Sequence, residues 1–343
     1  MSGASSQHVL ITLTTDEGLE GNAEALAKPG IYGETQASII AIVQEHLEPL
    51  LIGLDPWDTQ EILGRLRTVP ANNSSKAAVD IALHDLLARS LELPLHWYWG
   101  GSRTRQAVSW TLGIRAAEDM VAEAETIMAK AGIEAFKVKG GLVPDDDLQV
   151  IRLLRERLGP GVQLSLDPNE GYTADVAARV LGAMDEHGLA YVEEPIPHWQ
   201  SRARVDLARR IPMPILGDDS CFTLKDVVRQ IEDGAIAMVS IKTPRTGFYE
   251  SAAIATVAES FGLRCIIGTA VGGGLSSLAA LQFACSRPSF ASPSENSFGM
   301  NIVQDLVDAP MPTDGHLNVP SGPGLGTEVM VDRLSQLATC ARH

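Results

Sequence analysis

The chain has 343 residues, 45% of them hydrophobic, which suits a globular protein with a large buried core. Its 43 acidic residues outnumber 27 basic ones, and the formal net charge of −16 argues against a nucleic-acid backbone as a partner. Four cysteines lie far apart without C-x-x-C spacing, which excludes a cysteine-rich zinc cluster and a disulfide framework and indicates a reducing compartment; they are Cys221, Cys265, Cys285 and Cys340.

The N-terminal part of the chain predicts an α+β domain over residues 1–105. MSGASSQHVLITLTTDEG lacks the basic segment and long apolar run of a secretory signal, and HVLITLTTDEGLEGNAEA has the strand–turn–strand signature of a β-hairpin. Apolar residues then recur at helical spacing in ETQASIIAIVQEHLEPLLIG, DTQEILGRLRTV and SSKAAVDIALHDLLARSLEL, and we expect Ser74 and Ser75 to cap the last helix. The prolines and glycines of LPLHWYWGGSR mark the exit from this domain.

From residue 106 to about residue 297 the pattern becomes a short apolar strand, a loop and an amphipathic helix, repeated along the chain. The expected strands lie in AVSWTLGI, AFKVKG, VQLSLD, YVEEPI, PILGDD, MVSIKT and RCIIGT. This alternation predicts a parallel sheet, and so many units favour closure into a (β/α)₈-type barrel with one degenerate unit. A doubly wound sheet is the alternative, but the G-x-G-x-x-G motif that would support it is missing.

The last residues, 298–343, form a separate segment that is rich in proline and glycine. We expect it to end in a short apolar strand, GTEVMV, and a helix. No stretch along the chain is long and apolar enough to span a bilayer, so we expect a cytoplasmic protein without membrane contacts.

The stretch EAFKVKGG, residues 134–141, places two lysines in an apolar strand of an acidic protein. Because side chains alternate along a strand, Lys137 and Lys139 share one face and Val138 takes the other. If Val138 packs against helices, both ammonium groups face either solvent or a polar cavity.

Charged residues follow the expected strands in a regular order, and the carboxyl ends of the strands carry the chemistry in a barrel of this kind. Three successive strands end in carboxylates, and the strands on either side of them end in lysines; the residues are Lys137, Lys139, Asp167, Glu193, Glu194, Asp218, Asp219 and Lys242. Oxygen ligands without cysteine or histidine suit Mg²⁺ or Mn²⁺ better than Zn²⁺. Because unrelated rim charges would rarely fall into this order, we predict a metal site between two lysines.

Together these motifs resemble the enolase superfamily, in its branch of muconate-lactonizing enzymes, dipeptide epimerases and N-acylamino-acid racemases. The resemblance covers nearly the whole chain and rests on K-V-K at 137–139, D-P-N at 167–169, E-E-P at 193–195, D-D-S at 218–220 and I-K at 241–242. It implies an α/β fold, a modified TIM-like (β/α)₈-type barrel with an N-terminal α+β capping domain that the C-terminal segment completes.

The resemblance also implies a role for each charged residue at the strand ends. The reaction would remove the proton α to a substrate carboxylate through an enediolate, whose charge a bound Mg²⁺ or Mn²⁺ stabilises. A lysine that acts as base must be neutral, and we expect a neighbouring lysine and the cation to lower its pKa. The implied metal ligands are Asp167, Glu193 and Asp218, the acid/base pair is Lys139 and Lys242, Lys137 would neutralise the substrate carboxylate, and Asn169 and Asp219 would orient the ligands or Lys242.

The chain departs from these relatives in several places. The strand that precedes HVLITLTTDEG in relatives is missing or reduced to MSGASSQ, and no histidine follows a barrel strand, so a His–Asp dyad is absent. The stretch Thr269–Gly274, where relatives often carry an acid, offers no carboxylate, which argues against a dipeptide epimerase and weakens the muconate interpretation. Thr269 and Arg245 are candidate substrate contacts, and Arg245 either binds a distal anionic group or is a charge on the rim.

Three functions fit these residues. Two lysines on opposite faces of a substrate suit a racemase or epimerase of an amino-acid derivative or a similar small acid, because each enantiomer needs its own base. A cycloisomerase or dehydratase with one lysine as base uses the same residues, and a catalytically silent barrel retained as a binding protein is the third alternative. We expect an enzyme that forms a homo-oligomer and takes a small-molecule carboxylate substrate.

Overall fold

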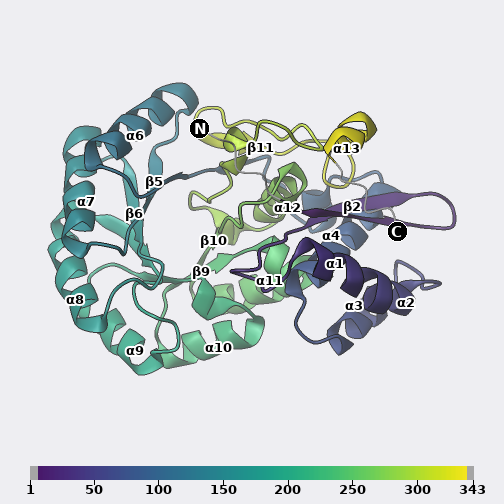
Figure 1. Ribbon diagram of the computed structural model, residues 1–343, viewed down its shortest axis with the longest axis horizontal. Helices are drawn as coiled ribbons and strands as arrows, with labels where there is room; N and C mark the ends of the chain where they lie inside the picture. The colour runs from purple at the N-terminus through teal and green to yellow at the C-terminus, as the bar shows by residue number, and fades with distance from the viewer. Residues whose placement is uncertain (1–6, 338–343) are drawn as a thin grey trace.

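The computed structural model describes residues 7–337, so the sequence predictions that concern MSGASS and Cys340 lie outside the described residues. Figure 1 shows a ring of helices around a set of strands and, beside it, a smaller part built of helices and a hairpin. None of the described helices is long and apolar enough to cross a membrane. Cys221, Cys265 and Cys285 are buried free thiols.

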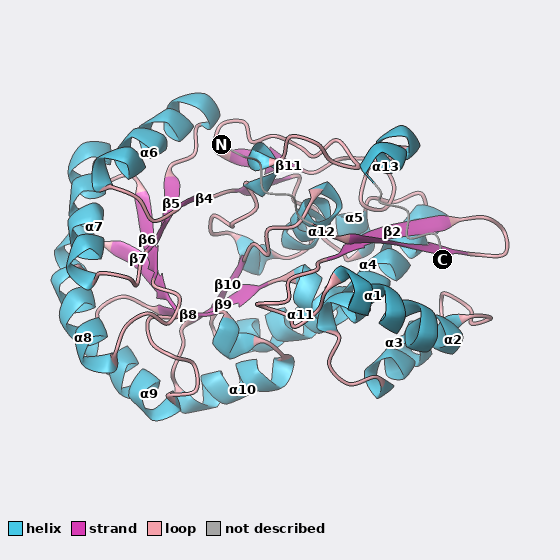
Figure 2. Ribbon diagram, viewed as in Figure 1, coloured by secondary structure: helices cyan, strands magenta, loops and turns pink. Residues whose placement is uncertain are grey.

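The ring is the predicted barrel. Its parallel strands follow the spatial order β10-β9-β8-β7-β6-β5-β4, and Figure 2 shows them inside the ring of helices. The strands are β4 (Trp110–Leu112), β5 (Ala135–Lys139), β6 (Gln163–Asp167), β7 (Leu189–Glu193), β8 (Ile215–Gly217), β9 (Met238–Ile241) and β10 (Arg264–Ile267). The helices between and after them are α6 (Ala117–Ala131), α7 (Pro144–Leu158), α8 (Ala174–Ala183), α9 (Ser201–Arg210), α10 (Leu224–Asp233), α11 (Thr243–Ser260) and α12 (Gly274–Cys285). Each of the predicted β/α units is therefore confirmed.

The gap between β10 and β4 is closed by a short segment rather than by a full strand. The Ser294 backbone N–H donates to the Ala107 carbonyl at 3.0 Å, and the Ser109 N–H donates to the Ser294 carbonyl at 2.9 Å. On the other side, the Glu295 N–H donates to the Ile267 carbonyl at 2.8 Å. This segment takes the place of the eighth strand and is the degenerate unit that the sequence predicts.

Side chains of β5 alternate between the apolar core outside the sheet and the interior of the barrel. Val138 is 1% exposed and belongs to the large apolar core that the strands share with the surrounding helices. On the inner side, Tyr191, Leu216, Met238 and Ile266 form a separate small cluster. Lys137, on the opposite face of β5 from Val138, is therefore directed toward the barrel interior.

The cap begins with an antiparallel hairpin that packs on its longest helix. Its elements are β1 (Val9–Thr14), β2 (Glu20–Ala25), α1 (Gln36–Ile42), one π-helical turn η1 (Val43–Leu47), α2 (Glu48–Leu51), α3 (Thr59–Thr68), α4 (Asn73–Ser90) and α5 (Leu95–Tyr98). The prediction that Ser74 and Ser75 cap α4 is wrong, because these serines do not accept the free N–H groups at the start of the helix but donate their own. Both residues lie inside the helix, and the distant Glu34 carboxylate accepts their backbone N–H groups at 2.7 and 3.0 Å.

The C-terminal segment returns to the cap, as predicted. Strand β11 (His316–Asn318) pairs with β3 (Arg105–Ala107), and the Leu325 N–H donates to the Asp85 carboxylate of α4 at 2.6 Å. The expected strand GTEVMV is wrong, because this stretch is irregular and pairs with no described strand; the expected helix forms as α13 (Val331–Leu337), which begins at the last residue of the stretch. Short 3₁₀ turns complete the fold: η2 (Asp185–His187), η3 (Asp219–Cys221), η4 (Pro288–Phe290) and η5 (Phe298–Asn301).

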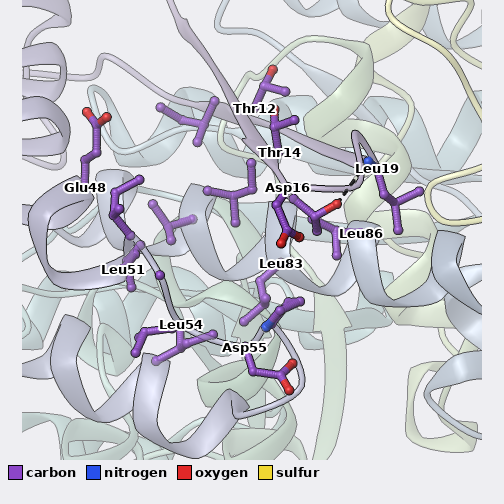
Figure 3. A pocket seen from close by; sticks show the side chains of 18 of the residues that line it. Thr12, Thr14, Asp16, Leu19, Glu48, Leu51, Leu54, Asp55, Leu83 and Leu86 are labelled. Atoms are coloured by element: carbon purple, nitrogen blue, oxygen red, sulfur yellow. Dashed lines mark hydrogen bonds between the residues drawn. The ribbon is translucent and has the colours of Figure 1, made fainter.

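A large hollow of about 970 Å³ lies within the cap, between β1, α2 and α4. Figure 3 shows its apolar walls, which include Leu51, Leu54, Leu83 and Leu86, with carboxylates such as Asp55 among the residues lining it. None of the predicted site residues lines this hollow. The candidate site is instead at the strand ends of the barrel.

Candidate active site

The carboxyl ends of β5 to β9 bring the predicted residues to one end of the barrel. Lys139, Asp167 and Glu193 are the last residues of β5, β6 and β7. Asp218 and Lys242 directly follow β8 and β9. Because neighbouring strands are parallel, these ends lie at the same edge, and Lys139 is the direct cross-strand neighbour of Asp167.

Lys137 is buried among carboxylates. Its ammonium lies 3.1 Å from Asp167, 3.2 Å from Glu193 and 2.7 Å from Glu295, and the side chain is 3% exposed. Burial alone would lower the pKa of Lys137, but the negative charges of Glu193, Glu295 and Asp167 raise it well above its ordinary value. Lys137 therefore stays positively charged and offsets part of the negative charge inside the barrel.

Lys139 is more open and has two partners. Its ammonium lies 2.6 Å from an Asp167 oxygen and 2.8 Å from the Asn169 side-chain oxygen. The Asn169 backbone N–H donates to the other Asp167 oxygen at 3.0 Å. With 30% of its side chain exposed, Lys139 is held in place while its ammonium can still be reached from the barrel mouth.

On the other side of the barrel, Asp218 pairs with two cations. One carboxylate oxygen forms an ion pair with Lys242, and the other lies 3.1 Å from the Arg245 guanidinium. Burial would raise the pKa of Asp218, but Lys242 and Arg245 hold it below its ordinary value. Asp219, which sequence reasoning places beside Lys242, has a raised pKa because of burial and the adjacent Asp218 charge.

Arg245 lies beneath the site rather than at its rim. It is 3% exposed, and its guanidinium also donates to the Cys221 and Ser240 carbonyls at 3.2 Å. The same group stacks over the Phe222 ring at 4.7 Å from the ring centroid. With these contacts, Arg245 holds Asp218 and the loop after β8.

The carboxylates of the site act on the pKa values of two of its lysines, Lys242 and Lys137. Burial acts to lower the pKa of Lys242, yet the charge of Asp218 raises it above its ordinary value, as the carboxylates do for Lys137. Lys139 repels the Lys137 ammonium, but the carboxylates around Lys137 outweigh that repulsion.

A buried ion pair that sequence reasoning missed supports the loop of Asp218. Glu194 pairs with Arg204, whose side chain is fully buried. The other Glu194 oxygen accepts the backbone N–H groups of Asp218 and Ser220 at 2.6 and 2.9 Å, and the Ser220 hydroxyl at 2.6 Å. The second glutamate of E-E-P was visible in the sequence, but nothing there distinguished Arg204 from the exposed arginines of the same helix.

Glu295 is the second residue that was missed. It lies on the closing segment and reaches Lys137, and one of its oxygens accepts the Thr269 N–H at 3.4 Å. The stretch Thr269–Gly274 itself brings no carboxylate, as predicted, but the barrel interior gains one from this later segment. Glu295 therefore supplies an acid inside the barrel, although the Thr269–Gly274 stretch offers none.

The carboxylates suit a hard divalent cation in their chemistry. Burial and the negative charges of Asp167, Glu295 and Asp218 raise the pKa of Glu193 well above its ordinary value, although Lys137 opposes the shift. A cation held by Asp167, Glu193 and Asp218 would relieve this repulsion. In the structure each of these three carboxylates forms an ion pair with a lysine. Within residues 7–337, no group of three histidine, cysteine, aspartate or glutamate side chains is close enough together to hold a metal ion as it stands.

An acid that is only 10% exposed, Glu24, lies near the end of β2 where the cap meets the barrel. Its carboxylate accepts the Gly273 N–H at 2.9 Å and the Ser276 N–H at 3.3 Å, at the first turn of α12. Burial and the nearby Asp305 charge raise the pKa of Glu24 from 4.5 to about 7. Glu24 therefore takes up a proton in the folded protein at a pH where the unfolded chain does not.

We expect the Glu24→Gln variant to be more stable than the wild type above pH 7 and equally stable near pH 4.5. Because the folded-state pKa is the higher one, wild-type stability falls as pH rises from 4.5 to about 7. The loss is about 3 kcal/mol, and a neutral amide avoids it while still accepting the N–H groups. Thermal unfolding across this pH range measures the difference, and a gain that does not change with pH would contradict the assignment.

The fold and the site together define a class of enzyme: a (β/α) barrel with carboxylates on three successive strand ends between two lysines. A family model described as Enolase C-terminal domain-like matches residues 119–333, and one described as Mandelate racemase / muconate lactonizing enzyme, N-terminal domain, matches residues 2–100. The chain belongs to the mandelate racemase/muconate lactonizing enzyme family of the enolase superfamily.

The relatives of the chain are isomerases. Muconate cycloisomerase 1 of Rhodococcus opacus is 30% identical over 94% of this chain and 89% of its own length. L-Ala-D/L-Glu epimerase of Clostridium acetobutylicum is 28% identical over 93% of this chain and 90% of its own. The solved structure of muconate lactonizing enzyme from Mucobacterium Smegmatis matches with a TM-score of 0.94 at 36% identity, over 96% of this chain and 94% of that one. The chain is thus an enzyme of the isomerase class.

Proposed function

We propose that the enzyme transfers a proton at the carbon α to a substrate carboxylate, with Lys139 and Lys242 as the two acid/base groups, and that it is a racemase or epimerase. The observation that supports this proposal most directly is the placement of the two lysines. They stand at the carboxyl ends of β5 and β9, with β6, β7 and β8 between them, so they lie on opposite sides of the three carboxylates. A planar intermediate between them has one lysine on each face, as 1,1-proton transfer requires.

The carboxylates would hold Mg²⁺ or Mn²⁺ through Asp167, Glu193 and Asp218. When bound, the cation supplies the positive charge that stabilises the enediolate and draws the charge of the two aspartates away from the lysines. Lys139 removes the proton from one face of the substrate, and Lys242 returns a proton to the other. The positive charge of Lys137 helps to neutralise the substrate carboxylate, and Asn169 keeps the Lys139 ammonium oriented.

A cycloisomerase is the second candidate. It is favoured by the match to the muconate lactonizing enzyme structure and by Glu295, which supplies the carboxylate that the Thr269–Gly274 stretch lacks. In that reaction one lysine acts as base or acid and the other is not needed for proton transfer. The substrate is a small carboxylic acid in both cases, and assembly into a homo-oligomer remains part of the proposal.

Solvent deuterium exchange tests the proposal. We expect the wild-type enzyme with Mg²⁺ in D₂O to exchange the α-hydrogen of at least one acid in a panel of N-acylamino acids, dipeptides and muconolactone, followed by NMR. Exchange should stop with EDTA, return with Mg²⁺ and be lost in Asp218→Asn, which keeps the shape of the side chain but not its charge. Exchange that survives EDTA, or none with any acid of the panel, would contradict the proposal. Deuterium that enters the α-position of both enantiomers of an amino-acid derivative supports the racemase, and interconversion of muconolactone with muconate alone supports the cycloisomerase.

A further inference from the structure

Helix α11, which begins directly after Lys242, is broken after its first turn. Gly247 has φ 66° and ψ −172°, so the backbone leaves the helical path there and resumes it with the residues that follow. A residue with a side chain rarely adopts this conformation, whereas glycine does so without steric cost. The helix therefore consists of a short first turn, residues 243–246, and a long second part that begins after the kink.

The first turn is tied to Lys242 itself. The Lys242 carbonyl accepts the backbone N–H groups of Arg245 and Thr246 at 2.9 and 3.2 Å, and it also accepts the Thr246 hydroxyl at 3.1 Å. Pro244 lies in this turn and has a fixed φ angle, so the turn has little freedom to change its shape. A shift of the kink at Gly247 would therefore carry the Lys242 backbone with it.

A buried carboxylate of the cap holds this kink in place. Asp80, on α4, accepts the Tyr249 backbone N–H at 2.9 Å and so caps the second part of α11. The same carboxylate fills the space beside Gly247, where an added Cβ would overlap it. Figure 1 shows α4 and α11 next to each other where the cap meets the barrel. The contact that fixes the kink thus comes from the cap and not from the barrel that carries Lys242.

His84 holds Asp80 in turn. The His84 Nδ1 lies 2.9 Å from the other Asp80 carboxylate oxygen, one turn further along α4, and both residues are buried. Burial acts to lower the pKa of His84, but the charge of Asp80 raises it above its ordinary value. The His84 ring packs among the rings of Tyr98, Trp99 and Phe248, and Phe248 directly follows the kink. The Asp80 carboxylate is thereby fixed against the kink.

We propose that Asp80 is a positioning residue for Lys242: it fixes the kink at Gly247 and thereby sets the turn from which Lys242 reaches the substrate. The inference rests on the proposed function for the role of Lys242 as an acid/base group. Lys139 is held separately, by side chains at and after the end of β6. Loss of the Asp80 carboxylate should therefore disturb proton transfer on one face of the substrate and spare the other.

Asp218 should keep its place when Asp80 is replaced, although Arg245 lies in the first turn of α11. The guanidinium of Arg245 is also held by the Cys221 and Ser240 carbonyls and by the Phe222 ring. Loss of a metal ligand would slow proton transfer on both faces, because both faces share one cation. A one-sided loss therefore distinguishes misplacement of Lys242 from damage to the metal site.

Deuterium exchange tests the inference with both enantiomers of the amino-acid derivative that the Mg²⁺-loaded wild type exchanges fastest. We expect Asp80→Ala to slow exchange about 10²-fold for the enantiomer whose exchange Lys242→Ala removes, and less than about 3-fold for the other, since a misplacement of about 1 Å can have such an effect. Asp80→Asn keeps an oxygen for the Tyr249 N–H and should retain most of the exchange. Gly247→Ala leaves Asp80 in place but presses a Cβ against its carboxylate, and it should show the same one-sided loss.

Asp85→Ala is the matched control. Asp85 is another buried carboxylate of α4, and it accepts the backbone N–H groups of Asn22 and Leu325, which both lie outside α11. Its loss should destabilise the cap in a comparable way and leave the ratio of exchange between the two enantiomers unchanged. A one-sided loss in Asp85→Ala as well would show that any damage to the cap has this effect, and would overturn the inference.

Chemical labelling of the lysines gives a readout that does not depend on activity. Lys242 is 12% exposed in its ion pair with Asp218, and we expect reductive methylation to label it several-fold faster in Asp80→Ala than in the wild type, with Lys139 unchanged. Mass spectrometry follows each lysine separately. Faster labelling of Lys242 together with a wild type that exchanges no α-proton would overturn the proposed function alone. Exchange in the wild type that Asp80→Ala slows equally for both enantiomers, or unchanged labelling of Lys242, would overturn the role of Asp80.

Discussion

Replacement of Lys139 or Lys242 by alanine should lower net turnover by about 10²- to 10⁴-fold, the usual effect of removing a positioned acid/base group. Both variants should still fold. Without Lys242, Asp218 keeps its contact with Arg245, and without Lys139, Asp167 keeps its contact with Lys137. Thermal unfolding checks this point, and Lys130→Ala, on the far side of the barrel, serves as the activity control.

The pattern of residual α-proton exchange distinguishes the two candidate reactions. In a racemase, Lys139→Ala should stop exchange from one enantiomer and leave some exchange from the other, and Lys242→Ala should show the mirror pattern. NMR of each enantiomer in D₂O gives the result. If Lys242→Ala keeps full turnover and Lys139→Ala is inactive, the enzyme has a single base, and the cycloisomerase becomes the better assignment.

Arg204→Met should cause the largest loss of stability among the substitutions considered. It leaves the Glu194 carboxylate buried with no cation beside it, a change that typically costs about 3–5 kcal/mol. Because Glu194 also holds the backbone of Asp218 and Ser220, we expect the stabilisation by Mg²⁺ to weaken as well. Urea and thermal unfolding with and without Mg²⁺ measure both effects.

The control for this prediction lies two residues earlier on the same helix. Arg202 is exposed, so Arg202→Met should change the free energy of unfolding by less than about 0.5 kcal/mol. The double variant Arg204→Met with Glu194→Gln should recover part of the lost stability, because no unpaired charge remains. Equal losses in Arg202→Met and Arg204→Met would show that the buried pair has no special role.

Much of the site could be predicted because strand ends are visible in a sequence. Each barrel strand is a short apolar run, and the first charged residue after it must lie at the carboxyl end, where Asp167, Glu193 and Asp218 are found. Lys137 and Lys139 followed from the alternation of side chains in one strand. These inferences needed only the local sequence, and the repeated β/α pattern indicated that all the strand ends lie at the same end of the barrel.

The features that could not be predicted depend on contacts between distant segments. Glu295 follows no apolar run, because the closing segment replaces a strand with two residues of backbone pairing. Glu34 caps a helix that begins 39 positions later, and a local pattern directed the prediction to the adjacent serines instead. The stretch GTEVMV has strand-like composition, but a strand also needs a free edge to pair with, and that requirement is not local.

The two closures made by late parts of the chain determine when the protein can complete its folding during synthesis. The segment that leads into the first barrel strand stays unpaired on one side until Ser294 bonds to Ala107 and Ser109, and the Asp85 carboxylate lacks one of its bonds until Leu325 reaches it. Neither the barrel nor the cap can therefore finish before most of the chain has left the ribosome. Such distant pairings make folding slow, and the partly made chain exposes an apolar strand edge in the meantime. The partly made chain therefore needs protection from aggregation while this edge is exposed.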